Sequence, residues 1–135
     1  MKRIVIFASG SGSNAENIIS FFREKPEVTV AAVLTNKQTA TVLDRCERLN
    51  AVVHLLQGLN IDLIVLAGFL WKIPSNLIEA FPDKIINIHP ALLPKYGGKG
   101  MYGDRVHQAV KENKESETGI TIHYVNENYD EGAII

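Results

Sequence analysis

The sequence predicts an α/β protein built on a doubly wound, mostly parallel sheet. Two observations support this prediction. Continuous apolar runs of strand length alternate with segments of helical period, and a glycine-rich turn follows the first apolar run. With 135 residues, 46% of them hydrophobic, the chain is long enough to bury the core of one domain, expected to span residues 1–135.

The expected elements follow one another along the chain. β-Branched and apolar runs predict strands at 3–8, 28–34, 51–53, 61–69, 84–89 and 118–125. The first helix is indicated by Ala15, Ile18, Ile19 and Phe22, which share one helical face before Pro26 ends the pattern. Further helices are expected at 39–50, 74–81 and 104–113.

Three of these elements carry additional signals. Residues 61–69 form the most hydrophobic run and are expected at the centre of the sheet. Pro74 suits the start of its helix, where a missing N–H needs no partner. Residues 118–125 alternate between apolar and polar side chains, which is typical of a strand with one exposed face.

Two places do not fit a complete sheet. Only the eight residues 54–61 separate the strand ending at Val53 from the one starting near Asp62, whereas a parallel crossover with its helix needs at least about ten to twelve. The chain also ends on the apolar stretch EGAII, with nothing after it to cover the sheet. We therefore expect missing segments near residues 53/54 and at the C-terminus.

The composition excludes several classes of function. There are 14 basic and 15 acidic residues without a block of like charge, which argues against nucleic-acid binding and favours a small-molecule partner. Cys46 is the only cysteine, so neither an intramolecular disulfide nor a cysteine-based zinc site is expected. No apolar run resembles a membrane span or a signal peptide. We expect a cytoplasmic protein.

The glycine-rich turn ASGSGSNAEN, at 8–17, lies where doubly wound folds bind phosphate. Gly10 and Gly12 let the backbone approach an anion, and the amides of Ser13 and Asn14 can donate to it at the positive end of the helix. The third glycine and the acidic residue of a dinucleotide site are absent, which disfavours NAD. The alternative is a tight turn in which Ser13 only caps the helix.

The segment KIINIHPALLPKYGG, at 84–98, runs from a strand into a proline-containing loop. Asn87 and His89 lie two apart, so their side chains point to the same side, at the end of a strand where ligands bind. An amide donor beside an imidazole suits acyl transfer. The alternative is that His89 only terminates the strand. Structural or solvated positions are expected for the other histidines, His54, His107 and His123.

Five segments, occurring in the same order, resemble the phosphoribosylglycinamide formyltransferases, a folate-dependent family of purine synthesis with a Rossmann-like fold: ASGSGSN, IVLAGF, NIHPALLPKYGG, GITIHYV and YDEGAII. The resemblance implies that the primary amine of glycinamide ribonucleotide attacks the formyl carbon of 10-formyltetrahydrofolate. It implies these two ligands as partners, without a metal, nucleic acid or membrane, in a monomer or a homodimer.

Matching the family's motifs residue by residue implies a catalytic trio of Asn87, His89 and Asp130. Asn87 would hold the developing oxyanion, and His89 would stabilise it in its charged form or pass a proton. Asp130 would support that charge and help move a proton to the leaving folate nitrogen. The phosphate turn maps onto Gly12, Ser13 and Asn14. The folate pocket maps onto Leu70, Trp71, Lys72, Ile73, Asn126, Glu127, Asn128 and Tyr129. Trp71 departs from the arginine that many members carry there.

Other functions remain open at this point. A hydrolase of the same folate would replace the amine with water, although such relatives usually carry an extra N-terminal domain. Methionyl-tRNA formyltransferase is disfavoured because it adds a C-terminal domain and needs a basic surface. A nucleotide-binding module without catalysis would keep only the turn. The presence of all three catalytic residue types favours the transferase.

Overall fold

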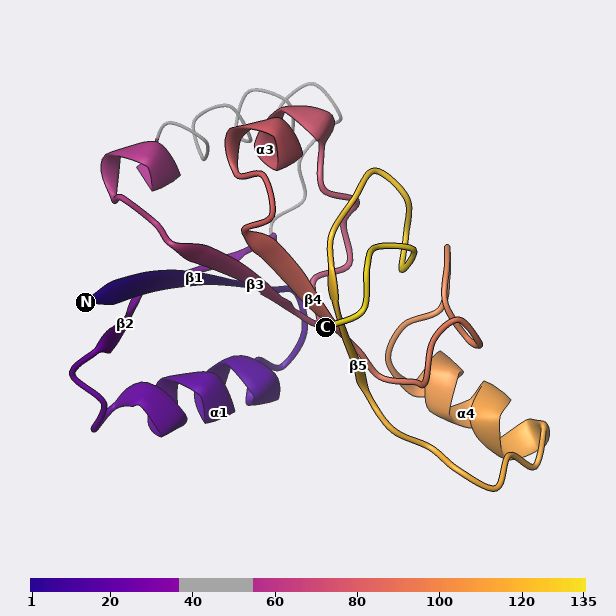
Figure 1. Ribbon diagram of the computed structural model, residues 1–135. Coiled ribbons are helices and arrows are strands. Elements are labelled where there is room, and N and C mark those ends of the chain that lie inside the picture. Colours follow the sequence, from indigo (N-terminus) through magenta and orange to yellow (C-terminus); the bar gives the residue numbers. More distant parts are fainter. Residues whose placement is uncertain (37–54) are drawn as a thin grey trace.

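The computed structural model describes residues 1–36 and 55–135, and this part of the chain has the predicted α/β fold (Figure 1). The strands of its one sheet are β1 (Lys2–Ala8), β2 (Val28–Thr35), β3 (Leu63–Ala67), β4 (Ile85–His89) and β5 (Thr121–Tyr124). The helices are α1 (Ser13–Phe22), α3 (Ser75–Ala80) and α4 (Asp104–Glu112). Outside the described residues lie the predicted helix 39–50 with Cys46, the predicted strand 51–53 and its junction, and His54.

The strand order is β2-β1-β3-β4-β5. β3 therefore lies at the centre, as its hydrophobicity predicted. The pairs β1–β2, β1–β3 and β3–β4 are parallel, whereas β5 runs antiparallel to β4. The sheet is thus mostly parallel, with an antiparallel strand next to the one that carries Asn87 and His89.

Both faces of the central strands are covered, which explains their continuous apolar sequences. On one face the core contains Val5, Phe7, Ile64 and Leu66, packed with Leu77 of α3. On the other face, a smaller cluster joins the sheet to α1 and consists of Ile6, Ala8, Ala15 and Ala67. Figure 1 shows α1 and α3 on opposite sides of the sheet.

The helices begin close to the predicted positions. Pro74 has an extended backbone conformation and immediately precedes α3, so its lack of an N–H leaves no helical hydrogen bond unmade. On α4, Val106 is fully buried. Among the helices that the structure describes, none is long and apolar enough to cross a membrane.

The loops after β1 and β3 meet at the carboxyl edge of the sheet. β1 has β2 on one side and β3 on the other, so the chain reverses its direction of winding between β1 and β3. The Ser9 amide donates to the Gly68 carbonyl (3.1 Å), and the Leu70 amide donates to Ser9 Oγ (2.9 Å). These bonds tie the two loops together at the switch point where open α/β sheets bind ligands.

Candidate active site

A cleft of about 980 Å³ opens at this edge of the sheet. It is bounded by the loops that follow β1, β3 and β4 and by the loop that follows β5. Nearly all of the predicted site residues line it: Gly12, Ser13, Asn14, Leu70, Trp71, Lys72, Ile73, Asn87, His89, Asn126, Asn128, Tyr129 and Asp130. Glu127 is exposed and is not part of this lining.

One wall of the cleft is the glycine turn, residues 9–14. Gly12 is the N-cap residue of α1 and has φ 83°, a left-handed conformation that glycine adopts without strain. No side chain caps the helix, so the expectation that Ser13 is the cap is wrong. Ser13 and Asn14 instead form the exposed first turn, whose amides have no intrahelical acceptor. The turn suits the binding of a phosphate.

The segment Leu70–Ile73 forms an apolar part of the wall. Ile73 is buried in the core, which fixes one end of the segment. At the other end, the ring of Phe69 packs edge-on against Phe7 (5.2 Å between centroids) and lies 6.2 Å from the ring of Trp71. Leu70 and Lys72 remain exposed between these anchors. This surface could receive a flat aromatic ligand.

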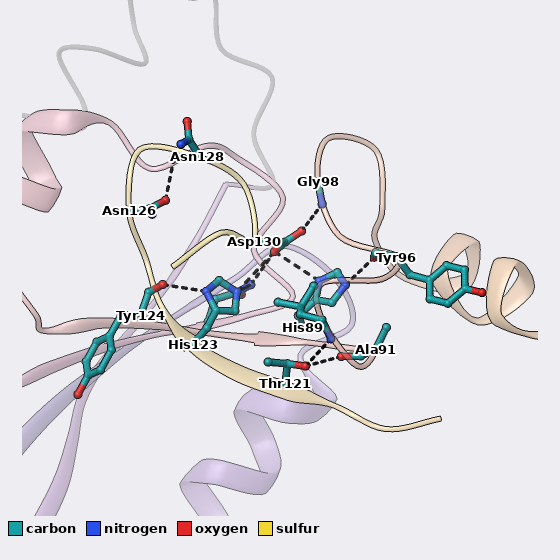
Figure 2. Close-up of polar contacts among 12 residues, drawn as sticks. His89, Ala91, Tyr96, Gly98, Thr121, His123, Tyr124, Asn126, Asn128 and Asp130 are labelled. Atoms are coloured by element: carbon teal, nitrogen blue, oxygen red, sulfur yellow. Dashed lines mark hydrogen bonds and ion pairs between the residues drawn. The ribbon is translucent and has the colours of Figure 1, made fainter. Parts of the chain in front are cut away.

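Polar side chains gather where β4 and β5 are paired. Asn87 lies opposite His123, and His89 lies opposite Thr121, so all four side chains share one face of the sheet. His89 and His123 are almost fully buried. Figure 2 shows both imidazoles pointing toward Asp130, which reaches them from the loop after β5.

The carboxylate of Asp130 is the centre of this arrangement. Its Oδ1 lies 3.4 Å from Asn87 Nδ2, 3.4 Å from His89 Nδ1 and 3.5 Å from His123 Nε2. Its Oδ2 accepts a hydrogen bond from the Gly98 amide (2.8 Å). We call Asn87, His89, His123 and Asp130 the polar cluster.

Gly132 lets the loop after β5 fold back far enough to deliver Asp130. A Cβ atom at Gly132 would collide with the carbonyl oxygen of Tyr124, so this close approach of two backbones requires glycine. On the opposite side of Asp130, a Cβ at Gly97 would meet the Asp130 Cβ at 3.2 Å and Leu93 at 2.7 Å. Two glycines thus make room for the carboxylate.

The charges within the polar cluster stabilise one another. Burial opposes the ionisation of Asp130, but hydrogen bonds from His123, His89 and the Gly98 amide outweigh it, so the pKa of Asp130 lies well below its usual range. The hydrogen bond to Asp130 raises the pKa of His123, against the opposing effect of burial. Asp130 is therefore a carboxylate throughout the physiological pH range.

The hydrogen bonds determine which nitrogen of His89 carries a proton in the neutral ring. His89 Nε2 lies 2.7 Å from the backbone carbonyl of Tyr96. Because a carbonyl oxygen only accepts, Nε2 must be the donor. Nδ1 is then the nitrogen without a proton in the neutral ring, and it faces the carboxylate of Asp130.

His123 was expected to be structural or solvated, and the structure instead places it in the polar cluster. Its Nδ1 donates to the Tyr124 carbonyl (2.8 Å), so its Nε2, 3.1 Å from Asn87 Nδ2, accepts from that amide when the ring is neutral. A sequence signal existed. Thr121 and His123 are polar residues two apart on a strand, as are Asn87 and His89, but recognising them as neighbours requires the antiparallel pairing of β4 and β5.

The polar cluster is suited to stabilising negative charge. The Asn87 amide and the two imidazoles surround one carboxylate oxygen, and the amide and the charged forms of the imidazoles could also donate to an oxyanion that develops beside it. The contacts to Oδ1 are longer than ideal hydrogen bonds, so they can be exchanged for contacts to a ligand. Among residues 1–36 and 55–135, no group of three side chains is arranged to hold a metal ion.

Comparison with known proteins gives a consistent result. The formyl transferase family matches residues 42–135. A chloroplastic phosphoribosylglycinamide formyltransferase of Arabidopsis thaliana is 37% identical over 99% of this chain and 53% of its own length. The phosphoribosylglycinamide formyltransferase of Bacillus subtilis is 34% identical over all of this chain and 77% of its own. The chain spans about half the length of the two plant relatives it matches.

Solved structures agree. Glycinamide ribonucleotide transformylase 1 from Symbiobacterium toebii superposes with a TM-score of 0.82 at 31% identity, covering 100% of this chain and 71% of the other. Phosphoribosylglycinamide formyltransferase from Bacillus halodurans gives a TM-score of 0.78 at 34% identity, covering 99% and 77%. With its sheet, its switch-point cleft and these similarities taken together, the chain belongs to the formyl transferase family.

Proposed function

We propose that this protein transfers the formyl group of 10-formyltetrahydrofolate to the primary amine of glycinamide ribonucleotide. The observation that carries the proposal is the convergence of Asn87, His89 and Asp130 at one end of the cleft, with the glycine turn lining the same cleft. The relatives named after this activity match nearly the whole chain, which supports the choice of substrates.

In the proposed reaction, the amine nitrogen attacks the formyl carbon and the carbonyl oxygen becomes an oxyanion. The Asn87 amide, turned from Asp130 Oδ1 to that oxygen, would stabilise the negative charge. In its charged form, His89 would donate from Nδ1 to the same oxygen, since its Nε2 donates to the Tyr96 carbonyl. The donors thus exchange one negative oxygen for another, with little rearrangement of the site.

Completing the transfer requires moving one proton. The attacking amine loses a proton, the bond from the formyl carbon to N10 of the folate breaks, and N10 gains a proton as tetrahydrofolate leaves. Charged His89 would give its Nδ1 proton to N10 and then take up the proton that the amine loses. Because the pKa of Asp130 is strongly lowered, its carboxylate acts mainly by stabilising positive charge on the amine and on His89.

The two substrates would contact different segments of the cleft lining. We assign the ribonucleotide phosphate to Gly12, Ser13 and Asn14, where the uncapped start of α1 offers backbone donors. We assign the folate to the segment from Leu70 to Ile73 and to the loop 126–130, which line the same cleft. The formyl carbon would then lie in the cleft, next to the polar cluster.

The test is a formyl-transfer assay with purified protein, 10-formyltetrahydrofolate and glycinamide ribonucleotide, following the release of tetrahydrofolate and the formylated product. The same assay is run without the amine and with Asp130→Asn, which keeps the shape of the side chain but removes its charge. We expect both products from the wild-type protein, none without the amine, and a severe loss of turnover in the variant.

Other outcomes would point elsewhere. Release of tetrahydrofolate without the amine would identify a hydrolase of the formyl folate. Binding of the ribonucleotide without any product would identify a binding module, and either result would overturn the proposal.

A further inference from the structure

Glu115 lies in the connection between α4 and β5, outside the cleft lining, yet two side chains from the loop after β4 converge on it. Tyr96 Oη donates to Glu115 Oε1 at 2.8 Å, and Lys95 Nζ donates to the same oxygen at 2.9 Å. The hydrogen bond from Lys95 and that from Tyr96 lower the pKa of Glu115, so it remains ionised and holds both donors. These three side chains therefore tie the loop after β4 to the connection between α4 and β5.

The tethered residue Tyr96 is also the one whose carbonyl contacts His89 (Figure 2). Its backbone has φ 57°, a left-handed conformation that is uncommon for a residue with a side chain and must be maintained by its surroundings. This conformation aims the carbonyl at His89 Nε2. The side chain that holds Tyr96 in place and the carbonyl that orients the imidazole thus belong to one residue.

We propose that Glu115 is a positioning residue that, through Tyr96 and Lys95, holds the Tyr96 carbonyl against His89 Nε2 and so leaves Nδ1 as the nitrogen that exchanges a proton. The inference deepens the proposed function and rests on it for its catalytic meaning. The orientation of the ring can be measured without any substrate.

The predicted chain of effects is specific. Without the tether, the Tyr96 carbonyl is released from its left-handed position, Nε2 loses a fixed acceptor, and the proton of the neutral ring is shared between both nitrogens. The neutral imidazole of His89 is then a mixture of both tautomers. Substrate contacts in the glycine turn and at Leu70–Ile73 are unaffected, so binding should be retained while turnover falls.

The experiment uses Tyr96→Phe, which removes only the hydroxyl, and Glu115→Gln, which removes the charge. The matched control is Glu112→Gln, because Glu112 Oε1 accepts an exposed hydrogen bond from Gln108 on α4 (2.8 Å) and contacts nothing in the site. The ring nitrogens of His89 are followed by ¹⁵N NMR in the ligand-free proteins, with signals assigned from His89→Asn. kcat and KM are then measured for both substrates, and thermal unfolding establishes that each variant is folded.

In the wild-type protein and Glu112→Gln, we expect the neutral form of the His89 ring to carry its proton on Nε2. Both tether variants should show mixed tautomers, a kcat lower by about tenfold and a KM changed by less than about twofold, a smaller effect than the roughly hundredfold that a misplacement of about 1 Å can cause. An unchanged His89 signal in both folded tether variants would overturn the inference, even if activity fell. If the wild-type protein transferred no formyl group, the NMR result would still test the positioning, so the two proposals fail separately.

Discussion

The glycine turn (residues 9–14) and the polar cluster line the same cleft, but their polar groups are satisfied in different ways. In the polar cluster, side chains from β4, β5 and the following loop already contact one another before any ligand is present. At the glycine turn, α1 begins at Gly12 without a side-chain cap, and its first amides are available to a ligand. In the proposed function, the first region responds to charge that develops during the reaction, and the second binds an anion that is present from the start.

This difference predicts different kinetic consequences. Damage to the polar cluster should reduce kcat, because its donors are needed most in the transition state. Damage to the glycine turn should raise KM for the ribonucleotide, because a phosphate is bound equally in the ground state and the transition state. Substitutions in each region test this division.

Replacing Asn87 by Ala should have the largest effect. The substitution removes the amide that is placed to stabilise the oxyanion, and losing one such donor typically lowers kcat by about 100- to 1,000-fold. KM for both substrates should change little. Steady-state kinetics of formyl transfer measure both quantities. A large rise in KM with kcat preserved would contradict the assignment of Asn87 to the reaction.

Replacing Gly132 by Ala should separate Asp130 from its partners. The added methyl group would collide with the Tyr124 carbonyl, so the loop must move and carry Asp130 away from His89. We expect kcat to fall by about 100-fold and the free energy of unfolding to fall by about 1–3 kcal/mol. Gly58→Ala is the control, because nothing lies within 4 Å of a Cβ at that position. Normal kinetics in Gly132→Ala would show that Asp130 does not depend on this close approach.

Replacing Gly12 by Ala tests the other region. A Cβ there meets nothing within 4 Å, so the cost is conformational only, arising from φ 83°. A left-handed residue with a Cβ costs roughly 1–2 kcal/mol, and the strained turn should bind phosphate less well. We expect KM for the ribonucleotide to rise by about tenfold with kcat nearly unchanged. A fall in kcat alone would place the turn in the chemical step.

The smallest expected effect is on how the free energy of unfolding depends on pH. Asp130 raises the pKa of His123 in the folded state. The stabilisation of the fold by charged His123 is therefore complete below about pH 6.5, the pKa of an unfolded histidine, and is lost as pH rises through the folded-state pKa. Asp130 has a lowered pKa, so its contribution is present above about pH 4 and is lost only in stronger acid. Urea unfolding of the wild-type protein and His123→Gln should therefore differ more at about pH 5.5 than at about pH 8.5.

If the difference in free energy of unfolding between these two proteins grew with pH, this would contradict an ion pair between His123 and Asp130. If the two proteins differed in free energy of unfolding by the same amount at both pH values, His123 would contribute no charge to the folded state. Both outcomes can be read from the same pair of titrations.

Much of the fold could be predicted from the sequence because the signals are local. Continuous apolar runs identified β1, β3 and β4, and the hydrophobicity of 61–69 placed β3 at the centre. The direction of β5 was not predicted, since alternation along Thr121–Tyr124 indicates a strand but not the sense in which it pairs.

The candidate site was predictable only in part for the same reason. Asn87 and His89 are two apart on one strand, so their proximity could be read from the sequence. Asp130 could be assigned only through the resemblance, because its approach depends on the backbone contact between Gly132 and Tyr124. His123 was missed because its role depends on pairing across β4 and β5.

The most direct test of the division between binding and reaction uses His89→Asn. Isothermal titration with glycinamide ribonucleotide gives the Kd, and the formyl-transfer assay gives kcat for the same preparation. We expect a Kd within about threefold of the wild-type value and a kcat lower by about 100-fold or more. A Kd that rises in proportion to the loss of turnover would contradict this division, because His89 would then bind the ribonucleotide and the two regions of the cleft would not be separate.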